Sequence, residues 1–311
     1  MFIYTLVSVV TAWGADGHEA IGWTLMSGLD SSSINKMKKM FAGQDAGDVS
    51  FAFENFERPW HFQPVADCQP VLCPDGACLA AAIPKLYGSL MDGAPLEVNG
   101  KVLSEADALK LLLNLIGDLH QPMHLTSEAA ASVGGPAVDQ RFTLWESGLT
   151  GKIQSTTGNF WWSGWSHVNT ISEFWQEEKR KFSESGFEEA IKAWTKENAQ
   201  LACTVMKQNS GDPVVEGIWL RTVRDRILIA GARSAIVVGE ILAARPASAF
   251  RAPVSEAKAA KASKGDGGVV WKNALVVLAV VLVFVVLAKT LDRGVDGAGG
   301  LIEMTVNKLK E

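Results

Sequence analysis

Apolar residues recur at three- and four-residue steps along most of this 311-residue chain, the spacing that gathers them on one face of a helix. The clearest example is EADALKLLLNLIGDLH, which follows the capping residue Ser104 and is stopped by Pro122. Few segments alternate in the way that strands do, and the sequence contains no internal repeat. The pattern therefore predicts one all-α domain over residues 13–245. Its other helical stretches are expected at residues 18–41, 79–90, 172–209 and 214–243.

The first twelve residues are apolar and end in VTA, with small residues at the last and third-last positions. This arrangement is typical of a secretory signal peptide, although the usual positive charge near its start is missing. Cleavage after Ala12 would make Trp13 the first residue of the mature protein. A buried first strand or an uncleaved anchor is the alternative interpretation of residues 1–12.

A second apolar segment lies near the other end of the chain. Asn273 to Ala288 carries no charge and is flanked by lysines, which predicts a single transmembrane helix over residues 273–291. A buried globular helix is the alternative, but residues 246–272 before it are rich in Ala, Lys, Ser and Gly, as in a flexible stalk. We therefore expect a single-pass type I membrane protein of the secretory pathway. Its ectodomain would be lumenal or extracellular, and residues 292–311 would be a cytoplasmic tail.

Composition and charge restrict the chemistry of this ectodomain. A hydrophobic content of 48% and a charged content of 20% fit a globular protein. The formal net charge is −5, and the sequence has no cluster of Lys and Arg of the kind that binds nucleic acid directly. If this protein handles a polyanion, bound metal must supply the positive charge.

Four cysteines lie in the predicted ectodomain, at positions 68, 73, 78 and 203. An oxidising compartment favours two disulfides over a zinc-binding cysteine cluster, and three pairings are possible. The loop CPDGAC has Pro and Gly suited to a tight turn, which favours a bond between Cys73 and Cys78. That pairing leaves Cys68 for the distant Cys203.

Four of the five histidines lie in short motifs, two of which also carry an aspartate. His18 ends WGADGH, His61 lies in WHF, and NLIGDLHQPMH contains both His120 and His124. The same motif places Asn114 and Asp118 four residues apart, on one face of a helix. Taken singly, such residues are more often structural hydrogen-bonding groups. Together, imidazoles and carboxylates suit zinc, which can activate water and neutralise a phosphate.

These motifs form an ordered set: WGADGH, then WHF, then GDLHQPMH, then LWE. The set resembles the zinc-dependent, single-strand-specific nucleases of the mung bean nuclease family, also called the P-one/S-one type, over residues 13–245. CLAAAI, WTKENAQLAC and AGARSA resemble later helices of that family. The resemblance implies an all-α fold related to bacterial zinc phospholipase C, with up to three zinc ions in a cleft. It also implies single-stranded DNA, RNA or nucleotides as substrates, and no protein partner is inferred.

The resemblance implies two ligand sets that share Asp118. One zinc would be held by the N-terminal amine and carbonyl of Trp13, with His18 and Asp118, and this set is complete. A second would use His61, Asp118, an upstream Asp and a helix His. The upstream Asp is best matched by Asp48, which would also orient or deprotonate the attacking water, with Asp45 a close rival. Asn114 replaces the helix His, and its neutral amide is a poor zinc ligand.

A third zinc would take His124 plus a His and an Asp that align here with RFTLWE. Phe142 stands at the position of that His and cannot ligate, whereas Glu146 stands at the position of the Asp and can. His120 or His167 are possible replacement ligands. Phe62 matches an aromatic residue on which the family stacks a nucleobase, and a core Phe beside a buried His is the alternative. Pro64 replaces an acidic base-contacting residue, so base preference cannot be carried over.

The leading hypothesis is a zinc-dependent endonuclease or phosphodiesterase that hydrolyses single-stranded nucleic acids, and nucleoside 3′-phosphates, outside the cytosol. Two lost imidazoles favour an alternative from another class, a catalytically inactive family member that acts as a membrane-displayed binding module. A lipid phosphodiesterase is the third hypothesis, because the fold is related to a phospholipase and the anchor would hold the domain near a bilayer.

Overall fold

The structure is a computed structural model that describes residues 13–53, 56–73, 76–126, 140–157, 168–209 and 211–245. All of these residues lie within one compact unit, residues 1–253. The predicted signal peptide, stalk, transmembrane helix and tail all lie outside the described residues.

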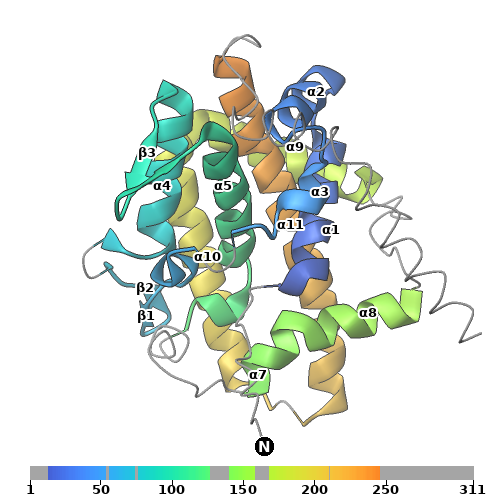
Figure 1. The fold of residues 1–311 in the computed structure, drawn as a ribbon. Helices are drawn as coiled ribbons and strands as arrows, with labels where there is room; N and C mark the ends of the chain where they lie inside the picture. The colour runs from blue at the N-terminus through green and yellow to red at the C-terminus, as the bar shows by residue number, and fades with distance from the viewer. Residues whose placement is uncertain are drawn as a thin grey trace, which may run out of the picture. The chain divides into compact units, whose positions relative to one another are not determined.

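Helices make up most of the described chain (Figure 1). They are α1 (Gly14–Gly28), α2 (Ser31–Met40), α3 (Ala46–Val49), α4 (Leu79–Asp92), α5 (Glu105–Leu119), α7 (Gln140–Thr143), α8 (Leu149–Thr157), α9 (Val168–Ser185), α10 (Phe187–Lys207) and α11 (Pro213–Ala244). Shorter helical turns are η1 (Arg58–His61), η3 (Pro122–His124) and η4 (Leu144–Gly148). Two small antiparallel hairpins pair β1 (Val65–Ala66) with β2 (Gln69–Pro70) and β3 (Leu96–Val98) with β4 (Lys101–Leu103). The all-α prediction is confirmed.

Helix α5 runs through the middle of the domain, where it contacts α1, α4, α10 and α11 (Figure 1). Its start follows the prediction, because the Ser104 side chain accepts a hydrogen bond from the Asp107 N–H at 3.1 Å. From Leu111 to Leu119 every residue is buried, so both its apolar and its polar side chains face neighbouring helices. The polar residues Asn114 and Asp118 are thereby held in the interior.

Helix α11 is the second long element of the core, and it packs along α1 and against α9 and α5. Among the described residues it is the one helix long and apolar enough to cross a membrane, but 67% of that window is buried inside the domain. Its end is fastened to other helices, because Lys36 donates to the Leu242 carbonyl at 2.8 Å and Arg245 pairs with Glu105 at 2.6 Å. These contacts identify α11 as a core helix.

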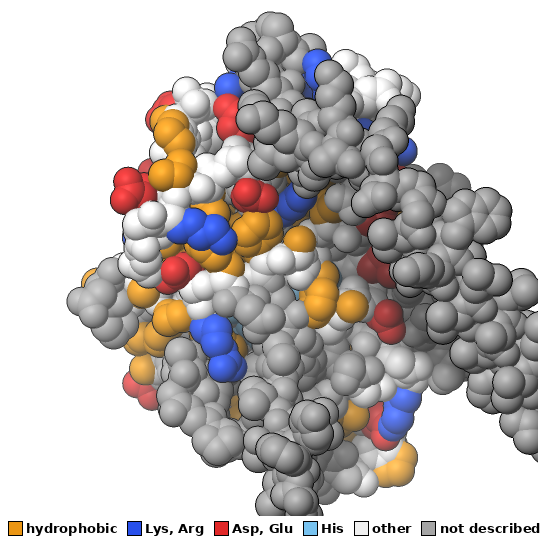
Figure 2. Space-filling view, viewed as in Figure 1, with side chains coloured by type: hydrophobic (Ala, Val, Ile, Leu, Met, Phe, Trp, Pro, Cys, Tyr) orange, Lys and Arg blue, Asp and Glu red, His pale blue; other side chains and the backbone are white. Residues whose placement is uncertain are grey.

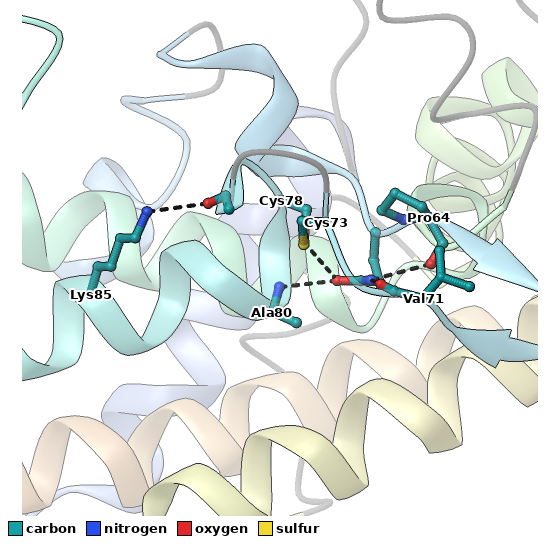
Figure 3. Close-up of a disulfide and its surroundings, with 8 residues drawn as sticks. Pro64, Val71, Cys73, Cys78, Ala80 and Lys85 are labelled. Atoms are coloured by element: carbon teal, nitrogen blue, oxygen red, sulfur yellow. Dashed lines mark hydrogen bonds between the residues drawn. A yellow bond between two sulfur atoms is a disulfide. The ribbon is translucent and has the colours of Figure 1, made fainter.

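Both predicted disulfides are present, Cys73 with Cys78 and Cys68 with Cys203. The second ties the β1–β2 hairpin to α10 across 135 residues of sequence. Buried Gln63 supports the first (Figure 3): its amide donates to the Val71 carbonyl at 2.9 Å, and its oxygen accepts from the Ala80 N–H at 3.2 Å. The cysteine loop is therefore fixed against the start of α4, close in sequence to His61.

Candidate metal centre

Imidazoles from α1 and η1 converge on the buried carboxylate of Asp118 at the end of α5. His18 Nε2 lies 3.3 Å from Asp118 Oδ1, and His61 Nδ1 lies 2.6 Å from Asp118 Oδ2. The His18 ring passes so close to α5 that a Cβ at Gly117 would lie 2.8 Å from it. Glycine at position 117 is therefore what lets α1 bring its histidine against the carboxylate.

Trp13 is buried at the start of α1, where it holds the beginning of the domain beside this carboxylate. Its indole Nε1 donates to the Gly117 carbonyl at 2.8 Å. Its Cβ also packs against Gly17, where a side chain would collide with it at 2.4 Å. The structure thus brings the Trp13 side chain against Gly117, beside His18 and Asp118, through indole and Cβ contacts rather than through the backbone atoms of the first predicted ligand set.

His124 approaches the same centre from η3. Its Nδ1 lies 2.5 Å from the His61 carbonyl oxygen, which fixes the ring. Phe62 stacks on the imidazole with centroids 4.6 Å apart, and Phe142 lies on it at 5.3 Å. His124 Nε2 is buried and has no hydrogen-bond partner among the described residues.

The protonation states of these groups suit a cation. Burial alone raises the pKa of Asp118, but the nearby imidazoles of His61 and His124 outweigh it and hold that pKa well below its usual range. Burial lowers the pKa of His124 to about 4, against the opposing effect of Asp118. At neutral pH the centre therefore contains an ionised carboxylate and a neutral imidazole, the forms in which these side chains bind metal.

Buried polar atoms without a hydrogen-bond partner concentrate around this carboxylate. In the described part of the chain they include both ring nitrogens of His18, Asp118 Oδ1, His124 Nε2 and Asn114 Oδ1. The 3.3 Å separation of His18 and Asp118 is within ion-pair distance but does not have hydrogen-bond geometry. Buried polar groups normally find partners, so this concentration indicates that a ligand is meant to satisfy them.

Residues 13–243 match the sequence model of the family described as S1/P1 Nuclease. The chain belongs to the S1/P1 nuclease family. It is 24% identical over 149 residues to Endonuclease 2 of Arabidopsis thaliana and 26% identical over 159 residues to Nuclease S1 of Aspergillus oryzae. These matches cover 42% and 43% of this chain, and the chain spans half the length of each relative.

The upstream acids of this S1/P1 family member do not lie in the buried centre. Asp48 is exposed, and its carboxylate accepts from the Asp45 N–H at 3.1 Å in a capping box at the start of α3. Asp45 is itself paired with Lys38 at 2.8 Å. The residue at the end of α3 that reaches the centre is Ser50, which sequence reasoning missed because a serine gives no metal-binding signal.

Ser50 is completely buried and links two of the predicted positions. Its hydroxyl donates to the His18 carbonyl at 2.7 Å, and its own carbonyl accepts from Asn114 Nδ2 at 3.1 Å. Asn114 thus lies on the face of α5 that looks toward the end of α3. Neither residue offers the imidazole or carboxylate that zinc prefers.

The other predicted positions are placed as follows. Phe62 and Phe142 are both buried, and both lie against His124. The side chain of Glu146 and the whole of His167 lie outside what the structure describes. His120 is turned to a different cluster, where its Nδ1 bonds the Ile116 carbonyl at 2.7 Å and its Nε2 lies 3.0 Å from Arg233.

The residues of this centre fit one metal position better than the others. In the described residues, no three His, Cys, Asp or Glu side chains are grouped so that they could hold a metal ion alone. His18 Nε2 and Asp118 Oδ1 are two donor atoms without a hydrogen-bond partner in the described residues. Zinc at this position would have them as side-chain ligands, and the sequence predicts the Trp13 backbone as a further one.

Proposed function

We propose that this chain is a zinc-dependent hydrolase of phosphodiester bonds in single-stranded nucleic acids, and of nucleoside 3′-phosphates. The observation that carries the proposal is a pair of buried atoms, His18 Nε2 and Asp118 Oδ1, which lie 3.3 Å apart and have no hydrogen-bond partner in the described residues. Membership of the S1/P1 nuclease family supports the substrate class. The named relatives, an endonuclease and a nuclease, support it as well.

Zinc held by Trp13, His18 and Asp118 would supply Lewis acidity and lower the pKa of bound water. The protein's own residues set up that chemistry. Asp118 stays ionised because the neighbouring imidazoles outweigh its burial, and the His61 contact fixes the carboxylate's second oxygen. The rings of Phe62 and Phe142 shield His124, so its neutral Nε2 is presented in a dry environment.

The charge of the protein agrees with a metal-based mechanism. On the face shown in Figure 2, Lys and Arg side chains are scattered among acidic and apolar ones, and no described histidine reaches that surface. A polyanionic substrate would gain little from such a face. Chelation of the metal should therefore remove substrate binding together with catalysis.

Two disulfides agree with an oxidising compartment, so we place the domain in the secretory pathway. The predicted signal peptide at residues 1–12 and the membrane helix at 273–291 complete this proposal. Removal of residues 1–12 would also free the Trp13 amine to act as a ligand.

A second candidate function is a catalytically inactive binding module. The observation that favours it is the burial of Asn114 and Phe142 in the centre, at the positions where the resemblance expects ligating imidazoles. Such a protein would retain the fold and the affinity for nucleic acid while losing turnover.

The deciding experiment uses purified full-length protein, with its N-terminus verified by mass spectrometry. Zinc-loaded protein is incubated with single-stranded DNA, single-stranded RNA and phospholipid vesicles, beside the variants Asp118→Asn and Asp225→Asn. We expect cleavage of the oligonucleotides by the wild type and by Asp225→Asn, whose carboxylate is exposed on α11. We expect none from Asp118→Asn. Oligonucleotide binding without cleavage by zinc-loaded wild type would establish the inactive module, and headgroup release alone would establish a lipid phosphodiesterase.

A further inference from the structure

The protein's own hydrogen bonds occupy part of a second metal position beside Asp118, where Asn114 Oδ1 is left without a partner in the described residues. On one side, Asn114 Nδ2 donates to the Ser50 carbonyl at 3.1 Å. On the other, His61 Nδ1 contacts Asp118 Oδ2 directly at 2.6 Å. All four residues are buried, so these contacts are not exchanged for water.

The two histidine contacts of the Asp118 carboxylate differ in length. Zinc–nitrogen and zinc–oxygen bonds of about 2.0–2.2 Å at a tetrahedral angle place two ligand atoms about 3.4 Å apart. His18 Nε2 and Asp118 Oδ1 are 3.3 Å apart, which is this separation. His61 Nδ1 and Asp118 Oδ2, at 2.6 Å, are too close to share an ion and are at the separation of a charge-assisted hydrogen bond.

The second ring nitrogen of His61 also faces an oxygen atom of the protein. His61 Nε2 lies 2.9 Å from the Phe56 carbonyl oxygen. Both ring nitrogens of His61 therefore already face an oxygen of the protein, a carboxylate on one side and a carbonyl on the other. The two nitrogens of His18, by contrast, face no hydrogen-bond partner in the described residues.

The remaining donors of a second site are also missing. Ser50 is the α3-end residue that faces His18 and Asn114, and it carries a hydroxyl rather than a carboxylate. Asp48, the nearest acid, is exposed and engaged in the α3 cap. The amide of Asn114 on α5 and the hydroxyl of Ser50 after α3 thus offer neither the second imidazole nor the second carboxylate that this set needs.

We propose that in this chain His61 is not a metal ligand but a positioning residue for Asp118, and that the Ser50–Asn114 hydrogen bond closes the second metal position. This inference deepens the proposed function, since it rests on the metal site at His18 and Asp118. The two histidines that contact the Asp118 carboxylate would then have different roles. His18 binds the ion at one carboxylate oxygen, and His61 orients the carboxylate through the other.

The test compares zinc content per chain, by elemental analysis, in the full-length variants His18→Gln and His61→Gln. Both substitutions remove a buried imidazole from Asp118, so each is the other's control for folding, which circular dichroism checks. We expect His18→Gln to lose a zinc ion relative to wild type and His61→Gln to keep the wild-type number with weaker affinity. An equal loss from both variants would overturn the proposal.

A gain-of-ligand variant tests the closed position directly. Ser50→Asp combined with Asn114→His supplies the missing carboxylate and imidazole, and we expect it to bind one zinc ion more than wild type. Ser50→Asp combined with Asn114→Leu, which adds no imidazole, should remain at the wild-type number. Because the double variant can fail to fold, Asn114→His alone is measured as well, and it should also gain an ion, since it supplies the imidazole and removes the hydrogen bond to Ser50. No gain in any folded variant would contradict the proposal.

Failure of this inference and failure of the proposed function give different results. If zinc content follows the prediction but the protein cleaves no nucleic acid, the hydrolase proposal fails and the assignment of His61 stands. If the protein cleaves nucleic acid but His61→Gln loses zinc, the hydrolase proposal stands and the assignment of His61 fails.

Discussion

Two buried polar clusters lie on either side of the C-terminal turn of α5, and they differ in how their groups are satisfied. The Asp118 cluster, defined as His18, His61, Asn114, Asp118 and His124, leaves several buried nitrogen and oxygen atoms without a hydrogen-bond partner in the described residues. The Arg233 cluster, defined as His120, Glu178, Glu197 and Arg233, leaves none of its described side chains in that state. Asp118 and His120 are only two residues apart, so the C-terminal turn of α5 contributes a residue to each cluster.

The Arg233 cluster joins four helix segments through one guanidinium on α11. Its Nε donates to Glu178 at 2.9 Å, one amino group to Glu197 at 2.6 Å, and the other to His120 Nε2 at 3.0 Å. The guanidinium also lies 4.9 Å from the centre of the Trp194 ring. Burial and the Arg233 charge together lower the pKa of His120 well below its usual range, so this histidine is a neutral acceptor.

The difference teaches how to tell a structural polar cluster from a binding site. A buried charge is costly unless the protein supplies partners for it, and the Arg233 cluster supplies them all. The Asp118 cluster also pays the free-energy cost of burying polar groups, but several of its atoms lack the hydrogen bonds that would offset that cost. Apolar side chains at these positions would avoid the cost. We propose that unsatisfied groups of this kind are retained for an external ligand, here a metal ion.

Removal of Arg233 should have the largest effect on stability. Arg233→Met leaves buried Glu178 with only the exposed Lys181 at 3.4 Å and Glu197 with only Arg226, so we expect a loss of about 3 kcal/mol in the free energy of unfolding, measured by urea denaturation. The exposed Arg180, which pairs with Glu177 and Glu184, is the control, and Arg180→Met should cause no comparable loss. A loss no larger than in the control would mean that the cluster does not hold the helices together.

Removal of the Asp118 charge should act on metal binding more than on folding. Asp118→Asn keeps the shape of the side chain but weakens its metal bond, so we expect zinc affinity to fall about 100-fold or more. The zinc-dependent rise in Tm should disappear with it, and Asp225→Asn should retain both. Undiminished zinc affinity in Asp118→Asn would show that the ion binds elsewhere.

Acid should weaken the Arg233 cluster in a defined pH range. Burial raises the pKa of Glu197, but Arg233 and Arg226 outweigh it and lower that pKa from 4.5 to about 2. A lowered folded-state pKa means that the stabilisation is complete above about pH 4.5 and is lost as pH falls toward 2. Thermal melts of wild type and Glu197→Gln should therefore converge over this range, and parallel curves would contradict the assignment. Because Glu197 is 39% exposed, solvent screening makes this effect smaller than that of Arg233→Met.

The smallest effect should come from Asp48. Asp48→Ala removes the reciprocal hydrogen bond of the α3 capping box, which costs about 1 kcal/mol or less. Zinc content should be unchanged, because the carboxylate is exposed and engaged in the cap. A lost zinc ion would return Asp48 to the ligand set and remove the case for Ser50.

Sequence reasoning recovered most of the fold because periodicity and capping residues act locally. The stretches at 79–90 and 214–243 correspond to α4 and α11, but two others were joined too far. Residues 18–41 are divided where Asp30 caps α2 by accepting from the Ser33 N–H, and residues 172–209 are divided at Gly186, whose φ is 79°.

The site was only partly predictable, because partners distant in sequence decide it. His18, His61, Asp118 and His124 meet as the motifs indicated. The choice between Asp48 and Ser50 depends on how α3 is oriented, which spacing does not encode. The Arg233 cluster left one usable signal, a charged residue inside the apolar run AGARSAIVV of a buried helix.

The most direct test of the account is anomalous diffraction at the zinc absorption edge from crystals of zinc-loaded protein. We predict a peak between His18 Nε2 and Asp118 Oδ1, with the Trp13 backbone as a further ligand, and no peak between His61 and Asn114. A peak between His61 and Asn114 would contradict the assignment of His61. The absence of any peak at Asp118 would contradict the central claim, that the unpartnered groups of this cluster form a metal site.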